Sequence, residues 1–558
     1  MVQKKLQKLP IGIQSFEKLR KKNYLYVDKT KDIYELATTG EAYFLSRPRR
    51  FGKSLLCSTL EALFNNKKEC FGGTWIATSD WEWKQYPIIS LSFARIKHAT
   101  PKALTENIKT QLDTIAKKYK LKLKQATPGK MLDDLIVLLA EKFGENSVVM
   151  LVDEYDKPLI NNLNDPKEVD AYRKVLKEFY SSLKDLDNEM QFLFITGVSK
   201  FSMVSIFSDL NHLESLSLSP NVATICGYTQ TELEHNFTDY LIKAEQKFGY
   251  SREHLLSEIK RWYNGYCFTQ PEDAPERVYN PFSILNFFKT LQFRNYWFTT
   301  GTPSFALEYF KNHDFEITDF EQVNSFDTDL EALDPKSLDL TTVLYQTGYL
   351  TIKSWEENID NANIMLGFPN QEVARSCAEG LMKFITGKSS SYVRKFAIEL
   401  GKLFTNDNVT TETLMAALIK LCTQIPSPVA PELERGYQFL FWLALELTGI
   451  NVFVEDPTAE GRIDITIIVG NKAYVIELKI RDSATEALAQ IDNKHYAEKY
   501  LAQGKNVIKI GILFNIDAKT VTEISLLEAG MTKPSLLINP VKITIPKRKN
   551  ALKKKSVR

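Results

Sequence analysis

The segment Tyr43–Leu56 places the strongest constraint on the fold of this chain. Its sequence predicts a short apolar strand, then a polar turn that contains proline, and then a helix that begins at Gly52-Lys53-Ser54. Glycine lets the backbone approach a phosphate, and the free N–H groups of a helix start carry partial positive charge. Lys53 would contact the β- and γ-phosphates of a nucleotide, and the Ser54 hydroxyl would bind Mg²⁺. The pattern predicts a phosphate-binding loop.

A second element is needed, because Gly-Lys-Ser also occurs at ordinary helix starts. The pattern G-x-x-x-x-G-K-[ST] has its first glycine at position 47, which is Arg47 in this chain. The second element is Val148–Glu154, where five apolar residues are followed by Asp153 and Glu154. Such a run predicts a strand buried on both faces, with both carboxylates at the edge where α/β sheets bind ligands. We expect Asp153 to face the Mg²⁺ ion and Glu154 to polarise the attacking water.

Strands and helices alternate through the first 225 residues. Strands are expected at 24–27, 86–93 and 190–197, and helices at 101–119, 129–143 and 170–183. This alternation predicts a mostly parallel sheet with helices on both faces. Thr196 lies at the end of the last strand, where it is either a sensor of the γ-phosphate or part of a turn.

The 558 residues are too many for one hydrophobic core, and we expect about three domains. Residues 226–425 show mainly helical periodicity, and their frequent aromatic residues are interpreted as core. This region includes a polar insert at 270–277 and an acidic run at 327–339. The prolines of Ile425–Pro431 indicate a linker, and 546–558 is a basic tail expected to be disordered. The predicted domains are therefore 1–225, 226–425 and 431–545, followed by the tail.

The composition is that of an ordinary globular protein. The formal net charge is only +2, so any nucleic-acid contact has to come from local patches. The six cysteines are scattered and form no C-x-x-C, which argues against a disulfide framework or a zinc site. No segment approaches the ~20 apolar residues of a membrane helix. These features predict a soluble, cytoplasmic protein without membrane contact.

A second candidate site lies near the C-terminus. Two strands are predicted at 461–468 and 473–480, on either side of Gly470-Asn471. Because side chains alternate along a strand, Asp464, Glu477 and Lys479 fall on one face of this hairpin. Two carboxylates can hold Mg²⁺, and the metal and a lysine can orient water and stabilise an attacked phosphodiester. The same pattern fits a half-solvated sheet with a surface ion pair.

The elements around the hairpin favour the metal site. Helices are expected at 432–448 and 483–503, and further strands at 451–455 and 507–514. Glu434 on the first helix would add a carboxylate, and Gln490 lies on the second helix. Helix, three strands, helix and strand, with D…E-x-K on the central hairpin, resembles the core of a restriction-endonuclease-like nuclease.

Nearly the whole chain resembles bacterial proteins that join an AAA-ATPase-like domain to a C-terminal PD-(D/E)XK nuclease-superfamily domain. The segments that carry the resemblance are Leu9–Phe16, Tyr26–Thr30, Arg47–Ser54, Asp153–Pro158, Tyr263–Tyr266, Tyr279–Ser283, Gly348–Thr351, Gly461–Asp464, Glu477–Lys479 and Ala487–Ile491. The implied fold is α/β, with an AAA-like P-loop NTPase sheet, a mainly helical middle region and a C-terminal restriction-endonuclease-like domain. Arg47 is part of this resemblance, although the missing glycine leaves ATP hydrolysis open.

The resemblance implies an ATPase coupled to a Mg²⁺-dependent nuclease. ATP and Mg²⁺ are the implied cofactors, and nucleic acid, DNA before RNA, is the implied partner, with a homo-oligomer as a possibility. In the nucleotide site, Arg49, Arg50, Gly52, Lys53, Thr196 and the metal ligands Ser54 and Asp153 would bind Mg·ATP, and Glu154 would be catalytic. In the nuclease site, Asp464, Glu477, Lys479 and Gln490 would be catalytic, and Glu434, Asp464 and Glu477 would hold the metal.

Two alternatives remain. One is a nucleotide-switched binding or regulatory protein whose nuclease fold does not cut, and the complete set of Asp464, Glu477 and Lys479 argues against it. The other is a nuclease whose P-loop domain serves only as a scaffold, which Arg47 favours.

Overall fold

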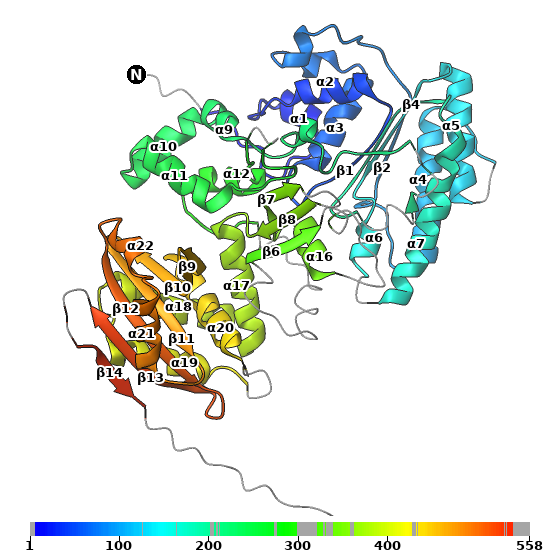
Figure 1. The fold of residues 1–558 in the computed structure, drawn as a ribbon. Helices are drawn as coiled ribbons and strands as arrows, with labels where there is room; N and C mark the ends of the chain where they lie inside the picture. The colour runs from blue at the N-terminus through cyan, green and yellow to red at the C-terminus, as the bar shows by residue number, and fades with distance from the viewer. Residues whose placement is uncertain are drawn as a thin grey trace, which may run out of the picture. The chain divides into compact units, whose positions relative to one another are not determined.

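The computed structural model describes residues 6–124, 127–162, 165–200, 206–207, 210, 212–272, 276–297, 321–326, 330, 339–357, 362–426, 431, 433–528, 531 and 533–539. The predicted basic tail, most of the acidic run and of the proline linker, and part of the polar insert lie outside these residues. The chain divides into two compact units (Figure 1), one that ends at Ser376 and one that begins at Cys377.

A five-stranded sheet forms the centre of the first unit. Its strands are β1 (Ala42–Ser46), β2 (Ile88–Ser92), β3 (Val148–Asp153), β4 (Met190–Gly197) and β5 (Glu214–Ser215). Their order is β2-β3-β4-β1-β5, and every neighbouring pair is parallel. The predicted parallel sheet is confirmed. Because β1 and β3 both lie beside β4, the loops that follow them emerge at the same edge of the sheet.

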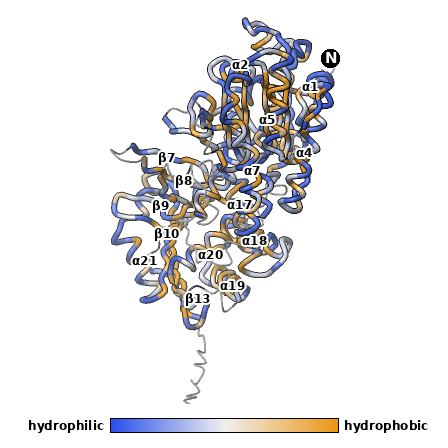
Figure 2. The backbone as a smooth tube through the Cα atoms, turned by 90° about the vertical axis from the view of Figure 1, so that its right-hand side faces the viewer, coloured by the Kyte–Doolittle hydropathy of each residue, from blue (hydrophilic) through white to orange (hydrophobic). Residues whose placement is uncertain are grey.

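Helices cover both faces of this sheet, as predicted. Figure 1 shows α4 (Pro101–Lys118), α5 (Pro128–Phe143) and α7 (Pro166–Tyr180) together on one side. On the other side lie α1 (Phe16–Lys21), α2 (Thr30–Thr39) and α3 (Lys53–Phe64). In Figure 2, orange hydrophobic segments mark the interior around α5.

The predicted strand at 24–27 is wrong. Tyr24 forms only a single bridge with Lys8. Leu25 and Val27 are instead buried against helices that follow the sheet in sequence: α9 (Gln230–Asn236), α10 (Thr238–Phe248), α11 (Arg252–Tyr263) and α12 (Pro281–Thr290). The aromatic residues of this cluster, such as Tyr263 and Phe287, are fully buried, which confirms that they are core.

The middle region also contains a sheet that the helical pattern did not predict. Its strands are β6 (Glu321–Phe326), β7 (Thr351–Glu357) and β8 (Ala362–Gly367), antiparallel in the order β6-β8-β7. In the sequence, α16 (Leu340–Thr347) lies between β6 and β7, and α17 (Gln371–Thr386) follows β8. The division between the two units falls within α17.

The second unit combines helices with a six-stranded sheet. The helices are α18 (Ser390–Thr405), α19 (Thr411–Cys422), α20 (Glu434–Glu446), α21 (Ala484–Asn493) and α22 (Glu498–Leu501). The strands are β9 (Asn451–Thr458), β10 (Gly461–Val469), β11 (Lys472–Lys479), β12 (Asn506–Asn515), β13 (Thr520–Glu528) and β14 (Ser535–Ile538), and they follow one another in the sheet. Only β11 and β12 pair in parallel, because α21 and α22 cross over between them.

Two predictions for this unit need correction. The helix expected at 483–503 is broken into α21 and α22, and His495 between them has a φ of 50°, which an α-helix does not accommodate. The last strand predicted from the sequence was 507–514, and the structure adds β13 and β14 to the sheet beyond it.

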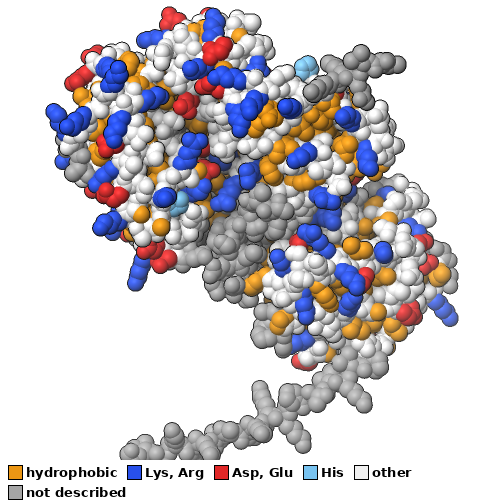
Figure 3. Space-filling view, turned by 180° about the vertical axis from the view of Figure 1, so that it is seen from behind, with side chains coloured by type: hydrophobic (Ala, Val, Ile, Leu, Met, Phe, Trp, Pro, Cys, Tyr) orange, Lys and Arg blue, Asp and Glu red, His pale blue; other side chains and the backbone are white. Residues whose placement is uncertain are grey.

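On the face shown in Figure 3, lysine and arginine side chains are interspersed with acidic ones, as the small net charge predicts. No helix in the described part of the chain is both long and apolar enough to cross a membrane.

Candidate functional sites

A cavity of about 380 Å³ lies at the carboxyl edge of the parallel sheet in the first unit. Gly52, Lys53 and Ser54 contribute to its wall from the loop after β1, and Glu154 contributes from the turn after β3. The sequence predicted these four residues as parts of one nucleotide site. The structure brings them together around one space.

The loop conformation depends on Gly52. This residue has a φ of 99°, in the left-handed region that favours glycine, and α3 begins directly after it. The unpaired N–H groups of the first turn of α3 are therefore directed toward the cavity. This is the geometry in which a helix start binds an anion.

Lys53 is hydrogen-bonded to backbone carbonyls of its own loop. Its Nζ atom donates to the carbonyl oxygens of Arg47 and Pro48 at 2.8 and 3.0 Å. Only 7% of the residue is exposed, and this burial lowers the pKa of its ammonium group. A phosphate in the cavity would compete with these two carbonyls for the lysine.

Arg47 has a structural role. Its guanidinium donates to three carbonyl oxygens, those of Ser46, Ser217 and Val222, at 2.8–3.2 Å. It also lies 4.3 Å from the ring centroid of Phe268. The side chain is buried and does not line the cavity. Arg47 therefore anchors the loop between β1 and α3, at the position where the general pattern has glycine.

Asp153 and Glu154 have different surroundings. One oxygen of Asp153, Oδ1, is buried without a hydrogen-bond partner among the described residues, and burial raises the pKa of its carboxyl group. A carboxylate oxygen left unpaired beside Ser54 fits a cation ligand. Glu154 lines the cavity with a φ of 54°, and its carboxylate pairs with Lys157 at 2.8 Å.

Thr196 lies apart from this group. Its hydroxyl donates to the carbonyl oxygen of Leu45 at 2.7 Å, and the residue is fully buried within the sheet. It does not line the cavity. The side chain thus joins β4 to β1, and Thr196 lies within the strand and not in the turn that was the alternative to a sensor.

Sequence reasoning assigned no role to several residues of the cavity wall. Gln14 comes from the N-terminal segment, Lys157 and Asn161 follow β3, and Phe282 belongs to α12. Arg49 and Arg50, which were predicted for the nucleotide site, also line the cavity, and the Arg50 guanidinium lies 5.0 Å from the ring centroid of Phe282. A signal was present, because Leu9–Phe16, Asp153–Pro158 and Tyr279–Ser283 are among the segments that carry the family resemblance.

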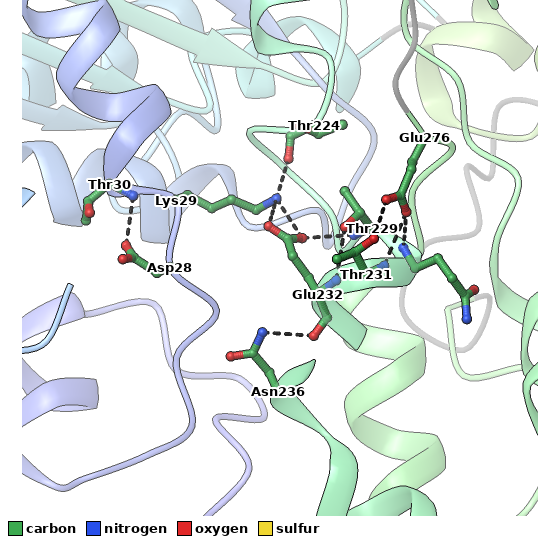
Figure 4. A network of polar contacts seen from close by, with 10 residues as sticks. Asp28, Lys29, Thr30, Thr224, Thr229, Thr231, Glu232, Asn236 and Glu276 are labelled. Carbon is green, nitrogen blue, oxygen red and sulfur yellow. Dashed lines mark hydrogen bonds and ion pairs between the residues drawn. The ribbon is translucent and has the colours of Figure 1, made fainter. Parts of the chain in front are cut away.

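Another of these segments, Tyr26–Thr30, is tied to the helices of the middle region (Figure 4). Lys29 Nζ donates to the carbonyl oxygen of Thr224 at 2.7 Å and pairs with Glu232 at 2.6 Å. Glu232 also closes the capping box at the start of α9. Lys29 therefore fixes the N-terminal segment against α9.

The second candidate site lies in the second unit. It consists of five side chains, Glu434 of α20, Asp464 of β10, Glu477 and Lys479 of β11, and Gln490 of α21. Gln490 Nε2 donates to Glu477 Oε2 at 2.8 Å. Lys479 Nζ lies 3.9 Å from Glu477 Oε2 and 3.8 Å from Glu434 Oε1. The structure thus brings all five predicted residues into one cluster.

The two central carboxylates differ in exposure: Glu477 is fully buried and Asp464 is half-buried. Glu477 has no exposed surface, which excludes its interpretation as part of a surface ion pair. Asp464 Oδ2 accepts a hydrogen bond from the Leu478 amide at 2.8 Å, and Glu477 Oε1 accepts one from the Asp464 amide at 3.3 Å. Burial raises the pKa of both carboxyl groups, and the negative charge of Asp464 raises that of Glu477 further. A cation between them would remove this repulsion.

The cluster offers a metal ion only a small number of carboxylate ligands. Within the described ranges, no three His, Cys, Asp or Glu side chains are arranged to hold one ion. Mg²⁺ is usually bound by one or two carboxylates and completes its shell with water and substrate phosphate. Asp464 and Glu477 fit that pattern.

Two further residues of this site were not predicted. Gln438 Nε2 donates to Glu455 Oε1 at 2.9 Å and to the carbonyl oxygen of Asp464 at 3.1 Å. The negative charge of Glu455 also raises the pKa of Asp464. Gln438 lies four residues after Glu434, on the same face of α20, and this spacing is the signal that could have identified it.

Comparison with known proteins agrees with this division of the chain. The family described as predicted AAA-ATPase matches residues 10–207, and the PD-(D/E)XK nuclease superfamily matches residues 432–524. An uncharacterized protein in the vnfD 5′ region of Azotobacter chroococcum mcd 1 is 35% identical over 525 residues, which cover 92% of this chain and 98% of that protein. No solved structure matches.

Proposed function

Because this chain belongs to the family of proteins that join a predicted AAA-ATPase domain to a PD-(D/E)XK nuclease-superfamily domain, we propose that it is a nucleotide-dependent nuclease. The first unit would bind and hydrolyse Mg·ATP. The second would hydrolyse phosphodiester bonds of nucleic acid, DNA before RNA, in the cytoplasm, with Mg²⁺ as cofactor. The observation that carries the proposal is the pair of carboxylates formed by the fully buried Glu477 and the half-buried Asp464, beside Lys479.

Each residue of the nuclease cluster has a role in this proposal. Asp464 and Glu477 would hold Mg²⁺, which supplies Lewis-acid stabilisation of the attacked phosphate when bound. Lys479 would position the water that attacks phosphorus and would stabilise the negative charge that develops as the P–O bond breaks. Gln490 would keep Glu477 oriented through their 2.8 Å hydrogen bond. Glu434, 3.8 Å from Lys479, would lie at the edge of the site as the ion-pair partner of that lysine, because it does not form a three-carboxylate metal site with Asp464 and Glu477 among the described residues.

The nucleotide site would operate through separate residues. Gly52 and the first turn of α3 would bind the phosphates, and Lys53 would leave its two loop carbonyls to reach them. Ser54 and Asp153 would hold the Mg²⁺ ion that accompanies ATP, and Glu154 would leave Lys157 to polarise the attacking water.

One observation favours the scaffold alternative. Lys53 is already satisfied by the carbonyls of Arg47 and Pro48, so the loop is held together without a nucleotide. Calorimetric titration with Mg·ATP separates the two functions, because a scaffold would show no binding. A protein that binds ATP but cuts nothing would instead favour the switched binding protein.

The nuclease function is tested by a cleavage assay on plasmid, linear duplex, single-stranded DNA and RNA. Each substrate is incubated with Mg²⁺ or Mn²⁺ and with or without ATP. We expect DNA to be cleaved only when the metal is present. We also expect ATP to change the rate of this cleavage. A homo-oligomer is tested in the same samples by light scattering. A protein that binds no metal and cuts none of the substrates would contradict the nuclease function.

A further inference from the structure

A buried glutamate lies behind the phosphate-binding loop. Glu372 is the second residue of α17, and only 1% of it is exposed. Its Oε2 atom accepts a hydrogen bond from the Ser283 hydroxyl at 2.6 Å, and its Oε1 atom accepts one from the Trp297 amide at 2.7 Å. An ionisable group is costly to bury unless it is hydrogen-bonded, so these contacts, together with one from the Tyr296 backbone, explain why the glutamate is tolerated in the core.

The contacts of Glu372 with Trp297 and Ser283 lead to the loop. The indole Nε1 of Trp297 donates to the carbonyl oxygen of Arg49 at 3.2 Å. Ser283 belongs to α12 and follows Phe282, whose ring centroid lies 5.0 Å from the Arg50 guanidinium. Two consecutive loop residues are therefore connected to one carboxylate through different intermediates.

This turn needs external support. Arg50 has a φ of 71°, in the left-handed region that a residue with a side chain rarely adopts. Such a conformation is kept only where the surrounding structure holds it. The Trp297 indole binds the carbonyl oxygen of Arg49, directly before Arg50, and the Phe282 ring contacts the Arg50 side chain itself.

We propose that Glu372 is a positioning residue of the nucleotide site, which fixes the Arg49–Arg50 turn through Trp297 and α12. The inference rests on the proposed function in that the turn lines the cavity assigned to Mg·ATP. It assigns a part in nucleotide binding to a residue more than 300 positions away in the sequence from the loop that it supports.

The test uses four variants of the full chain. Glu372→Ala removes the hydrogen bonds with Trp297 and Ser283. Glu372→Gln keeps the shape, because its amide can accept from the Trp297 amide and donate to the Ser283 hydroxyl. Trp297→Phe removes only the bond to Arg49. Glu379→Ala is the matched control, because Glu379 is a buried glutamate on the same helix whose partner is Arg394 and not the loop.

Two readouts are measured. The first is the rate of tryptic cleavage after Arg49 and Arg50 in the nucleotide-free protein, followed by mass spectrometry. The second is the Kd for Mg·ATP. Glu372→Ala and Trp297→Phe should cleave faster at this turn and bind Mg·ATP about tenfold more weakly, which corresponds to the loss of one hydrogen bond. Glu372→Gln and Glu379→Ala should match the wild type in both.

The outcomes separate this inference from the proposed function. Faster cleavage at the turn in a protein that binds no ATP would support the positioning of the loop and contradict the nucleotide site. Normal cleavage and normal affinity in both Glu372→Ala and Trp297→Phe, with unchanged circular dichroism, would overturn the inference. If Glu372→Ala does not fold, the inference is decided by comparing Trp297→Phe with the control Glu379→Ala in tryptic cleavage at the turn and in the Kd for Mg·ATP.

Discussion

The ammonium group of Lys53 lies 2.8 Å from the carbonyl oxygen of Arg47, so the lysine expected to bind phosphate is held by its own loop. Arg47 is in turn fixed by carbonyl oxygens of Ser217 and Val222, about 170 residues further along the chain. The loop is therefore pre-formed. Nucleotide binding would exchange the contacts of the lysine without building the loop anew.

Replacement of this lysine should weaken nucleotide binding. Lys53→Ala is expected to raise the Kd for Mg·ATP at least about tenfold, because a charge-assisted contact to phosphate is lost. Lys174→Ala is the matched control, since that lysine is 77% exposed on α7. Calorimetry measures the affinity and circular dichroism checks the fold. Equal affinities for Lys53→Ala and the wild type would remove Lys53 from the site.

Glu154 should affect turnover and not affinity. Glu154→Gln keeps the size of the side chain but removes its ability to polarise water, so kcat for ATP should fall about a hundredfold or more. The Kd for Mg·ATP should stay within about twofold of the wild type. Steady-state phosphate release together with calorimetry measures both quantities. Unchanged phosphate release by Glu154→Gln would show that another group activates the water.

Metal binding to the second unit should release protons. Burial raises the pKa of Asp464 and Glu477 above the ordinary carboxyl values near 4, so the metal-free pair retains a proton at higher pH. Mg²⁺ binds the ionised form, and its apparent affinity should therefore rise with pH. For the same reason, the stability of the metal-free protein should fall as the pH rises from about 4 toward the raised pKa values.

Titration calorimetry in two buffers of different ionisation enthalpy measures this proton release. The control is Glu477→Gln, which has no proton to release at that position. Metal affinity that is independent of pH, with no proton released by the wild type, would show that the pair is already ionised or does not bind the metal.

Gln490 should influence the nuclease through Glu477. Gln490→Ala removes the 2.8 Å hydrogen bond that holds Glu477 Oε2, so cleavage should slow about tenfold and metal affinity should decrease. The control is Gln503→Ala, because Gln503 is exposed beyond the end of α22. If both variants cut at the wild-type rate, Gln490 has no part in orienting the carboxylate.

Local patterns were enough to predict the elements that carry the candidate sites. The apolar runs of β3 and β4 predicted buried parallel strands, and alternation along β10 and β11 predicted that Asp464, Glu477 and Lys479 share a face. Those three side chains do lie in one cluster. Such predictions succeed because neighbours in a strand or hairpin also determine one another's orientation.

Contacts between distant segments could not be read in the same way. Nothing near Arg47 indicates that its guanidinium is buried against Phe268, and nothing near Glu372 indicates that it supports Arg49 through Trp297. The segment 24–27 has the composition of a strand, yet Leu25 and Val27 are buried against helices that lie some 200 residues later. Tertiary packing overrides local propensity at such positions.

The central claim is that Asp464 and Glu477 of the second unit form a metal-dependent phosphodiesterase site. Asp464→Ala, Lys479→Ala and the control Asp492→Ala, an acid half-exposed on α21, are compared with the wild type in a nuclease assay and a parallel Mg²⁺ titration. We expect Asp464→Ala to lose both cleavage and metal affinity, Lys479→Ala to lose cleavage while it still binds the metal, and Asp492→Ala to retain both. Robust cleavage by the Asp464→Ala protein would contradict the account.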